Sequence, residues 1–327
     1  MTVTITAKDV SELRKATGAG MMDCKEALME SGGDIEGALD FLRKKGQKVA
    51  AKRADRDTNE GVVIALTSDA GNQGIIMALG CETDFVAKNE DFISFANSIA
   101  QLALENLPET KDELLALPFD GSTVAEKLVE RTGTIGEKLE ISDYQKMDGE
   151  NISSYIHAGS KIGVILSYKC DPSEEAAKFF RSIAMHTAAM NPSILDPSEF
   201  DAELVAKETE ALQGQITVEN EDRARLGKAL KTVPKFASKL QLTDEVMAQA
   251  EADIKAELEA EGKPEKIWDK IVPGKMERFV ADNTLLDQER CLLSQFFALD
   301  DTKTVEAAIK DFNENAEIVE FKRVSVG

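Results

Sequence analysis

Apolar and polar positions follow a helical period in the N-terminal part of the chain. Thr6 and Asp9 have the spacing of a capping box, in which a hydroxyl and a carboxylate three residues later close the first turn of a helix. Val10 and Leu13 follow at helical spacing, and Gly18-Ala19-Gly20 interrupts the pattern. We therefore expect a first helix between Thr6 and Gly18.

Two more short helices are expected after it. Met21 and Met22 begin the second, which ends near Gly32-Gly33. Asp34 can cap the third, and Gly46 is expected past its end. The inward-facing positions of this third helix are Ile35, Ala38, Leu39, Phe41 and Leu42. The pattern predicts a compact three-helix module, followed by a linker or helical extension at residues 49–56.

The period changes to that of β-strands at Gly61. Residues 61–66 and 74–81 are strand-like and flank a turn at 68–72, which predicts a β-hairpin. A helix follows, with the apolar stripe Phe92, Ile93, Phe95, Ala96, Ile99, Ala100 and Ala103. The same layout returns in residues 155–168 and in a helix from Ser173. This weak repeat predicts two related α+β subdomains.

A long polar stretch of helical composition lies between Pro197 and Pro264. One helix begins near Phe200 and another runs from Thr243 to Gly262, which predicts a protruding antiparallel helical hairpin. Residues 318–326 alternate like a last strand. The expected fold class is α+β with antiparallel sheets. Its parts are the N-terminal module with its linker (1–55), one core subdomain (56–148), a second core subdomain in two pieces (149–195 and 263–327), and the hairpin between those pieces (196–262).

Composition is that of a soluble globular protein. Of 327 residues, 43% are hydrophobic and 30% are charged, and no stretch approaches the ~18 apolar residues of a membrane span. The N-terminus lacks the basic and apolar regions of a signal peptide, so we expect a cytoplasmic protein without a membrane partner. The four cysteines are scattered and only two histidines occur, so buried reduced thiols are expected rather than disulfides or a structural metal site.

Charge separates the N-terminal module from the rest. The formal net charge is -21; residues 1–55 carry 10 basic and 9 acidic residues, a net of +1, which leaves -22 for the remainder. Nucleic-acid binding requires clustered Lys and Arg, so this balance argues against direct contact with nucleic acid.

Signs of catalysis are few. The sequence has no phosphate-binding loop, no nucleophile elbow and no H-E-x-x-H motif, and Gly18-x-Gly20 lacks the third glycine of a dinucleotide fingerprint. His157 lies at a hairpin tip without a marked nucleophile or base, and His186 falls on an apolar stripe, as a core histidine would. We therefore expect a protein that is not an enzyme and that uses no metal or cofactor.

Two apolar features leave a choice between packing and binding. Asp84 or Thr83 can cap the next helix, which places Phe85 in its first turn. Phe85 is then either a packing residue or an apolar wedge for a partner's groove. Met21 and Met22 pose the same question, because Met fills gaps in cores and also occurs on adaptable binding surfaces. On one helix, both are not expected to face the same way.

These segments together resemble the elongation factor Ts family, the guanine-nucleotide exchange factors for elongation factor Tu. The first matching segment, Leu13 to Lys25, contains Thr17-Gly18-Ala19-Gly20-Met21-Met22, and the second is Thr83-Asp84-Phe85-Val86-Ala87-Lys88-Asn89. Shorter matches follow in the same order along most of the chain. They are Gly33 to Glu36, Leu42 to Gly46, Ile135 to Glu137, Tyr155 to Val164, Ile183 to His186, and Lys266 to Phe279.

The resemblance implies a ubiquitin-associated-like N-terminal module, a two-subdomain core and elongation factor Tu as partner. It implies that Asp84 and Phe85 push against the partner's nucleotide-binding domain, disturb its magnesium site and loosen GDP, while Thr83 and Val86 hold the tip in shape. It also implies contacts by His157. Further contacts are implied for Leu13, Met21, Met22, Ile271 and Val272.

Two departures from the family pattern bear on these expectations. Residues from about Gly214 to Gln241 look like extra length in the excursion, so dimerisation through the helical hairpin is left open. The C-terminal helical module of some relatives is not seen in the sequence, so contacts attributed to it are not carried over. The alternative function is an adaptor that binds elongation factor Tu without accelerating GDP release; a hydrolase using His157 is disfavoured because no nucleophile is marked.

Overall fold

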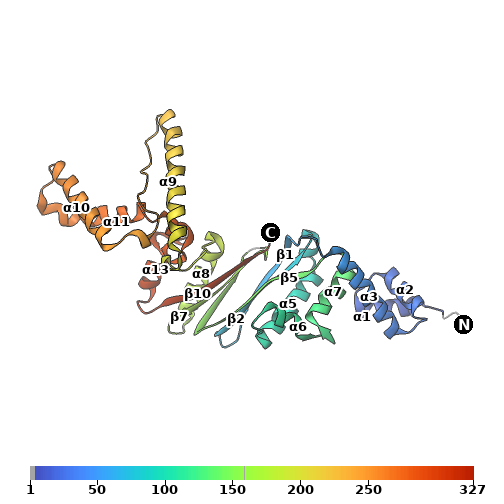
Figure 1. Cartoon of the computed structure of the whole chain (residues 1–327). Coiled ribbons are helices and arrows are strands. Elements are labelled where there is room, and N and C mark those ends of the chain that lie inside the picture. The colour runs from blue at the N-terminus through green and yellow to red at the C-terminus, as the bar shows by residue number, and fades with distance from the viewer. Residues whose placement is uncertain (1–3, 158) are drawn as a thin grey trace. The chain divides into compact units, whose positions relative to one another are not determined.

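The computed structural model describes residues 4–157 and 159–327, and it confirms the α+β class (Figure 1). The chain forms two compact units. The first comprises residues 1–188 and 317–327, and the second comprises residues 189–316. The second unit is therefore inserted between two elements of the first. The finer subdomain boundaries expected from the sequence stay a prediction.

The first unit begins with the three expected helices, α1 (Ala7–Thr17), α2 (Met21–Glu30) and α3 (Ile35–Arg53). Thr6 and Asp9 form the capping box, and Asp34 accepts a hydrogen bond from the Gly37 amide. Gly18 closes α1 with φ 68°, a left-handed conformation that favours glycine. The buried side chains of the module form a core of their own: Val10, Leu13, Ala19, Cys24, Ala27, Leu28 and Ala38.

The third helix differs from the prediction. It does not end at Gly46 but continues to Arg53, as a helical extension. Gly46 is needed for packing, because a Cβ there would lie 3.2 Å from the carbonyl oxygen of Val129 on α7 (Val124–Ile135). Ile35 and Leu39 are exposed instead of facing inward, since Ala38, Phe41 and Leu42 take the side that contacts α1 and α2.

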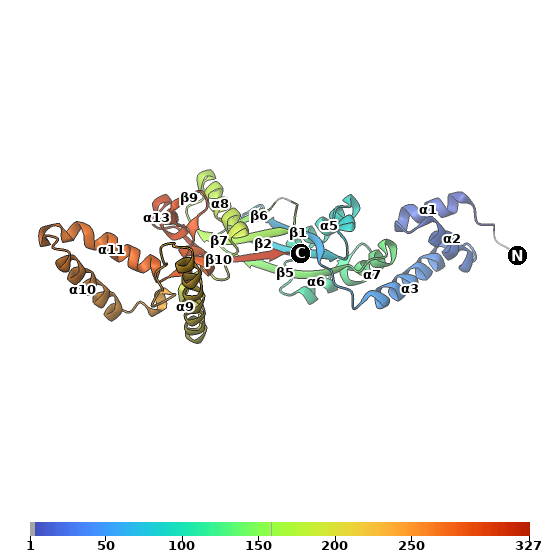
Figure 2. The same ribbon diagram turned by 90° about the horizontal axis from the view of Figure 1, so that it is seen from above.

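Two antiparallel sheets follow, each with a helix on its outer face (Figures 1 and 2). The first sheet has the order β1 (Glu60–Thr67), β2 (Gln73–Cys81) and β5 (Glu140–Asp148), and α5 (Glu90–Asn106) packs on it. The second has the order β10 (Glu317–Ser325), β7 (Ile162–Lys169) and β6 (Asn151–Ile156), with α8 (Glu174–Met190) against it. The predicted repeat of hairpin and helix is confirmed.

The sheets bury their inner faces against each other. Side chains from both sheets share one core: Val63, Ile76, Ala78, Met147, Ile152, Ile165, Val324 and Val326. On the outer side of the second sheet, Tyr168 stacks on Phe180 of α8 with ring centroids 3.8 Å apart. His186 is buried on α8, as predicted, and Cys24, Cys81 and Cys291 are buried free thiols, while Cys170 is half-buried.

The second unit is mainly helical. Its long helices are α9 (Ala202–Arg225), α10 (Asp244–Ala260) and α11 (Trp268–Asp282). The two helices predicted for the excursion form, but their pairing differs. α10 packs on α11, where Lys275 Nζ lies 2.6 Å from Glu257 Oε2, while α9 is followed by an extended segment that returns beside it. The turn at Gly262 therefore joins the helical pair, one helix later than expected.

Several short elements complete the two units. In the first unit they are α4 (Asp84–Ala87), α6 (Lys111–Ala116), β3 (Pro118–Phe119) and β4 (Ser122–Thr123). In the second they are α12 (Leu285–Arg290), β8 (Phe296–Phe297), β9 (Asp300–Thr304), α13 (Val305–Phe312) and the 3-10 helices Pro197–Glu199, Lys239–Gln241, Glu265–Ile267 and Leu292–Ser294.

Candidate partner-binding site

The carboxylate of Glu137 holds the start of the tip at residues 83–86. Thr83 precedes α4, and both its amide and its hydroxyl donate to the Glu137 carboxylate, at 3.0 and 2.7 Å. The thiol of Cys81 donates to the Thr83 carbonyl oxygen at 3.2 Å, and burial raises the pKa of Cys81 to about 12, so this thiol keeps its proton. Thr83 is thus fixed by three hydrogen bonds at the end of β2.

Phe85 projects from this fixed base. Its side chain is 84% exposed, whereas Val86 packs against the core of the first sheet and Ala87 is buried. The short helix α4 therefore divides its residues into an inward pair and one outward aromatic ring. This geometry favours the wedge over the packing residue, because a Phe side chain that is 84% exposed makes little packing contact with the rest of the protein.

Asp84 lies beside Phe85 and carries a charge. Lys88 Nζ lies 2.7 Å from Asp84 Oδ2, and this hydrogen bond, with the nearby charges of Lys88 and Lys161, lowers the pKa of the Asp84 carboxyl. The tip thus presents an aromatic ring next to an ionised carboxylate.

The turn that carries His157 lies at the same end of this unit. Ser160 accepts a hydrogen bond from the Val63 amide of β1 at 2.6 Å, and Lys161 Nζ lies 2.7 Å from Glu60 Oε2 at the start of β1. His157 is exposed, and its Nδ1 lies 3.2 Å from the Tyr155 hydroxyl. The structure therefore places Lys161, which follows this turn, close enough to the tip for its charge to act on Asp84.

The N-terminal module offers a second apolar surface. Met21 and Met22 are 59% and 72% exposed, and Met29, about two turns further along α2, is exposed as well. Both are exposed because α2 is short and only its Cys24, Ala27 and Leu28 side is covered, while as consecutive residues they point in different directions from the helix. Leu13 is 1% exposed, so it supports the module from inside and its side chain does not reach the surface.

Ile271 and Val272 lie on α11 in the second unit. Val272 is buried and Ile271 is half-buried, so only Ile271 can offer side-chain surface to a partner.

Sequence reasoning missed Met29 on α2, although its spacing of seven residues from Met22 places both on one helical face.

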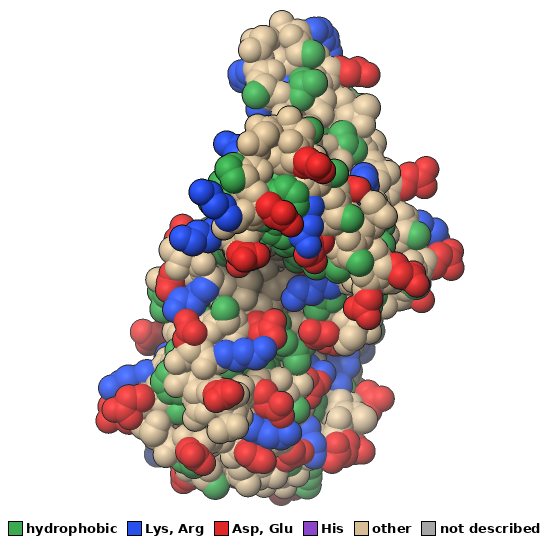
Figure 3. Space-filling model, turned by 90° about the vertical axis from the view of Figure 1, so that its left-hand side faces the viewer, with side chains coloured by type: hydrophobic (Ala, Val, Ile, Leu, Met, Phe, Trp, Pro, Cys, Tyr) green, Lys and Arg blue, Asp and Glu red, His purple; other side chains and the backbone are tan. Residues whose placement is uncertain are grey.

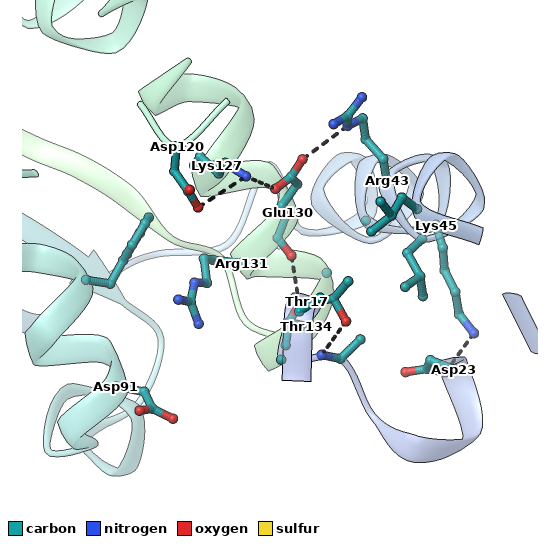
Figure 4. A pocket seen from close by; sticks show the side chains of 18 of the residues that line it. Thr17, Asp23, Arg43, Lys45, Asp91, Asp120, Lys127, Glu130, Arg131 and Thr134 are labelled. Atoms are coloured by element: carbon teal, nitrogen blue, oxygen red, sulfur yellow. Dashed lines mark hydrogen bonds and ion pairs between the residues drawn. The ribbon is translucent and has the colours of Figure 1, made fainter. Parts of the chain in front are cut away.

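A cavity of about 730 Å³ separates the N-terminal module from the core (Figure 4). Charged side chains line it, and Glu130 on α7 accepts from Arg43 on α3 at 3.1 Å and from Lys127 of the same helix at 2.9 Å. Arg131 lies over the Phe95 ring, 5.1 Å from its centroid. The Arg43–Glu130 pair fastens α3 to α7, so the cavity lies beside a joint of the unit.

Across 4–157 and 159–327, no group of three or more His, Cys, Asp and Glu side chains is arranged to hold a metal ion. Of the helices in the described part of the chain, none combines the length and the apolar character that crossing a membrane requires.

Comparison with known proteins agrees with the resemblance. The chain is 65% identical over 325 residues to the Elongation factor Ts of Rhodopirellula baltica, with 99% of each chain covered. It is 48% identical to that of Flavobacterium johnsoniae, again with 99% of each covered, and 47% identical to that of Streptococcus pneumoniae, with 99% of this chain and 92% of the relative covered. The family model described as Elongation factor TS matches residues 82–327.

The chain belongs to the elongation factor Ts family.

The family match begins immediately before the tip, at Glu82, and includes the whole second unit. The alignment with the Rhodopirellula relative leaves out only about one residue in a hundred, so it spans the segment from Gly214 to Gln241. The extra length expected from the sequence is therefore shared with that elongation factor Ts.

Proposed function

We propose that this chain is a guanine-nucleotide exchange factor of translation elongation. It binds GDP-bound elongation factor Tu and promotes release of GDP, so that GTP can bind. Membership of the elongation factor Ts family supports this function, and the exposed Phe85 on a fixed tip carries the proposed mechanism. The activity makes and breaks no covalent bond, so it needs neither a catalytic residue nor a cofactor.

The mechanism is a thermodynamic linkage. If the chain binds nucleotide-free elongation factor Tu more tightly than the GDP-bound form, GDP must bind the complex more weakly by the same factor. We assign this preference to Phe85, which inserts into the nucleotide-binding domain and displaces elements that hold the magnesium ion. Asp84 competes for groups otherwise engaged in the metal site. Since Glu137 already fixes Thr83, little order has to be gained when the tip binds.

Other surfaces hold the partner while the tip acts. In the proposal, Met21 and Met22 contact a helix of the nucleotide-binding domain, and His157 contacts the partner near its phosphate-binding end. Ile271 adds a contact from the second unit. Leu13 and Val272, which are buried, and Val86, which is half-buried and packs on the core of the first sheet, keep these surfaces in shape.

Release of a fluorescent GDP analogue from elongation factor Tu, followed by stopped flow, tests the mechanism. We expect Phe85→Ala to slow accelerated release about tenfold or more, since a central aromatic anchor is worth about 2 kcal/mol or more. Asp84→Asn should show a smaller loss. The matched control is Phe296→Ala, which removes another exposed Phe, in the second unit. Full acceleration by both tip variants would refute the wedge.

An adaptor function is the competing proposal. The exposed Met21 and Met22 surface favours it, because an apolar surface can bind without distorting a nucleotide site. An adaptor would bind elongation factor Tu in a direct binding assay and leave the rate of GDP release unchanged. A wild-type chain that accelerates release excludes the adaptor.

A further inference from the structure

Residues 226–240 form an extended segment of the second unit, which we call the basic strap. It returns along α9 without forming a helix or strand before Lys239. The Asn220 side chain of α9 both accepts from the Lys231 amide at 2.7 Å and donates to the Lys231 carbonyl oxygen at 2.8 Å. Gln213 donates to the Pro234 carbonyl oxygen at 3.0 Å. Side chains of α9 therefore hold the strap along its length.

The other end of the strap is fixed to α11 and α12. Asn283 Oδ1 accepts from the amides of Lys235 and Phe236 at 2.9 and 3.1 Å, and Asp287 Oδ2 accepts from the Lys239 amide at 2.7 Å. Asn283 and Asp287 are both buried. Buried side chains thus hold the backbone of the strap, while the strap's own side chains make none of these hydrogen bonds.

Aliphatic side chains of the strap face solvent. Leu226 and Leu230 are 68% and 61% exposed, and Val233 and Leu240 are exposed too. Single exposed apolar residues are normal on protein surfaces, but here four lie on one segment whose backbone is fixed. This concentration makes the segment a candidate interaction site.

The strap is basic in an acidic protein. It contains Lys228, Lys231, Lys235 and Lys239 and no acidic residue, while the whole chain has a net charge of -21. Lys231 pairs with Glu219 of α9 at 2.8 Å. Within residues 4–157 and 159–327, the other three lysines have no ion-pair partner, and all four are exposed. Figure 3 shows basic, acidic and hydrophobic side chains close together at the top of the view, where Figure 1 draws the far end of α9.

We propose that the basic strap docks on an acidic protein face that also offers apolar contacts. This inference rests on the proposed function, because we assign that face to elongation factor Tu. A protein fits better than RNA for two reasons. The four aliphatic side chains alternate with the lysines and have no use against phosphates, and the one aromatic residue, Phe236, is half-buried rather than free to stack on bases.

The strap is too small to hold a protein alone. Stable interfaces bury roughly 1,200–2,000 Å² in total, far more than four aliphatic and four lysine side chains provide. It gains effect on a partner that other surfaces of the chain already hold, since the second contact is then intramolecular. The strap therefore acts on affinity and association rate, and its lysines make both sensitive to salt.

The test compares Lys228→Glu/Lys235→Glu with Lys263→Glu/Lys266→Glu, all in the full chain. The control pair makes the same charge change at exposed lysines of the same unit that have no ion pair in the described residues. We measure the Kd for GDP-bound elongation factor Tu by biolayer interferometry at low and high salt, and the KM and kcat of GDP release. Each chain is first checked for unchanged thermal unfolding.

We expect the strap variant to raise Kd and KM about tenfold at low salt, with kcat unchanged and a shallower salt dependence. The control should stay near wild type. A second variant, Leu226→Ser/Leu230→Ser, should raise Kd and keep the wild-type salt dependence. An unchanged Kd in both strap variants overturns the proposal. The proposal is also overturned if the strap variants leave the Kd for elongation factor Tu unchanged but alter the binding of a fluorescent oligouridylate, or alter self-association measured by sedimentation.

The two proposals fail in different ways. If wild-type chain binds elongation factor Tu without accelerating GDP release, the exchange function is wrong, and the Kd comparison still decides the role of the strap.

Discussion

Gly46 and Gly133 meet where α3 crosses α7. A Cβ at Gly133 would lie 2.4 Å from the Cα of Gly46, closer than any real contact allows. The two helices are therefore in backbone contact, and the Arg43–Glu130 ion pair lies on the same joint. Through this joint the N-terminal module and its exposed Met21 and Met22 are held against the core that carries Phe85.

Gly133→Ala should open this joint. The added methyl group meets backbone, which cannot rotate away, so we expect a loss of about 1–3 kcal/mol in the free energy of urea unfolding or in the attachment of the module. Limited proteolysis at residues 54–59 should become faster. Gly214→Ala is the control, because Gly214 lies inside α9 with open space around it and should gain about 0.5–1 kcal/mol. Equal changes in the free energy of unfolding for Gly133→Ala and Gly214→Ala would show that the contact between α3 and α7 does not matter for stability.

Removing Glu137 should loosen the tip while leaving Phe85 in place. Glu137→Ala deletes the acceptor of two hydrogen bonds from Thr83. Hydrogen exchange at the amides of residues 84–88 should speed up about fivefold, equivalent to about 1 kcal/mol, and accelerated GDP release should fall. Glu109→Ala breaks an ion pair with Lys146 elsewhere in the unit and should change neither measurement. Unchanged exchange at the tip would show that the tip is held by other contacts.

The methionine surface should govern affinity. Met21→Ala/Met22→Ala removes two exposed side chains of α2, and we expect KM for elongation factor Tu to rise about tenfold with kcat unchanged, because the lost contacts are the same throughout exchange. Met190→Ala removes an exposed Met outside the module and serves as control. A fall in kcat instead would assign these residues to the distortion of the nucleotide site.

Asp287 should make stability depend on pH in the direction opposite to most carboxylates. Burial raises its pKa, so the folded state holds this proton more tightly than the unfolded chain does. The resulting stabilisation is fully present below the ordinary pKa of 3.8 and is lost as pH rises through the raised value. Asp287→Asn stays neutral, so its urea stability relative to wild type should improve as the pH rises from about 3.5 to about 7.5.

The exposed Asp301 of the same unit provides the matched control substitution, Asp301→Asn. A stability difference between Asp287→Asn and wild type that does not change with pH would mean that burial does not raise the pKa of Asp287.

Local patterns predicted the elements, and distant contacts decided where the predictions failed. The capping box at Thr6 and the hairpin strands follow from neighbouring residues, so the sequence sufficed. Gly46 has the sequence features of a helix end, but a glycine 87 positions later gives it a packing role that no local pattern reveals. The pairing of α10 with α11 is likewise a tertiary choice between helices of similar composition.

The candidate site was predictable in part for the same reason. The sequence predicted that Thr83 or Asp84 caps the helix with the apolar stripe, but Asn89 caps that helix, and Phe85 lies in the separate short helix α4, which has no side-chain cap. The exposure of Phe85 depends on Glu137 and on the packing of Val86. Helical spacing alone could not distinguish the buried Leu13 from the exposed Met21. The exposure of the strap was hidden because its anchors, Asn283 and Asp287, lie more than forty residues further along the chain.

The insertion of the second unit has a consequence for the order of synthesis. β10 supplies a strand of the second sheet, and its Val324 enters the core between the sheets, yet it follows all of residues 189–316 in the chain. A ribosome must therefore complete the inserted unit before the first unit can close its sheet. Until then β7 has an unpaired edge, and the growing chain exposes a surface that invites aggregation.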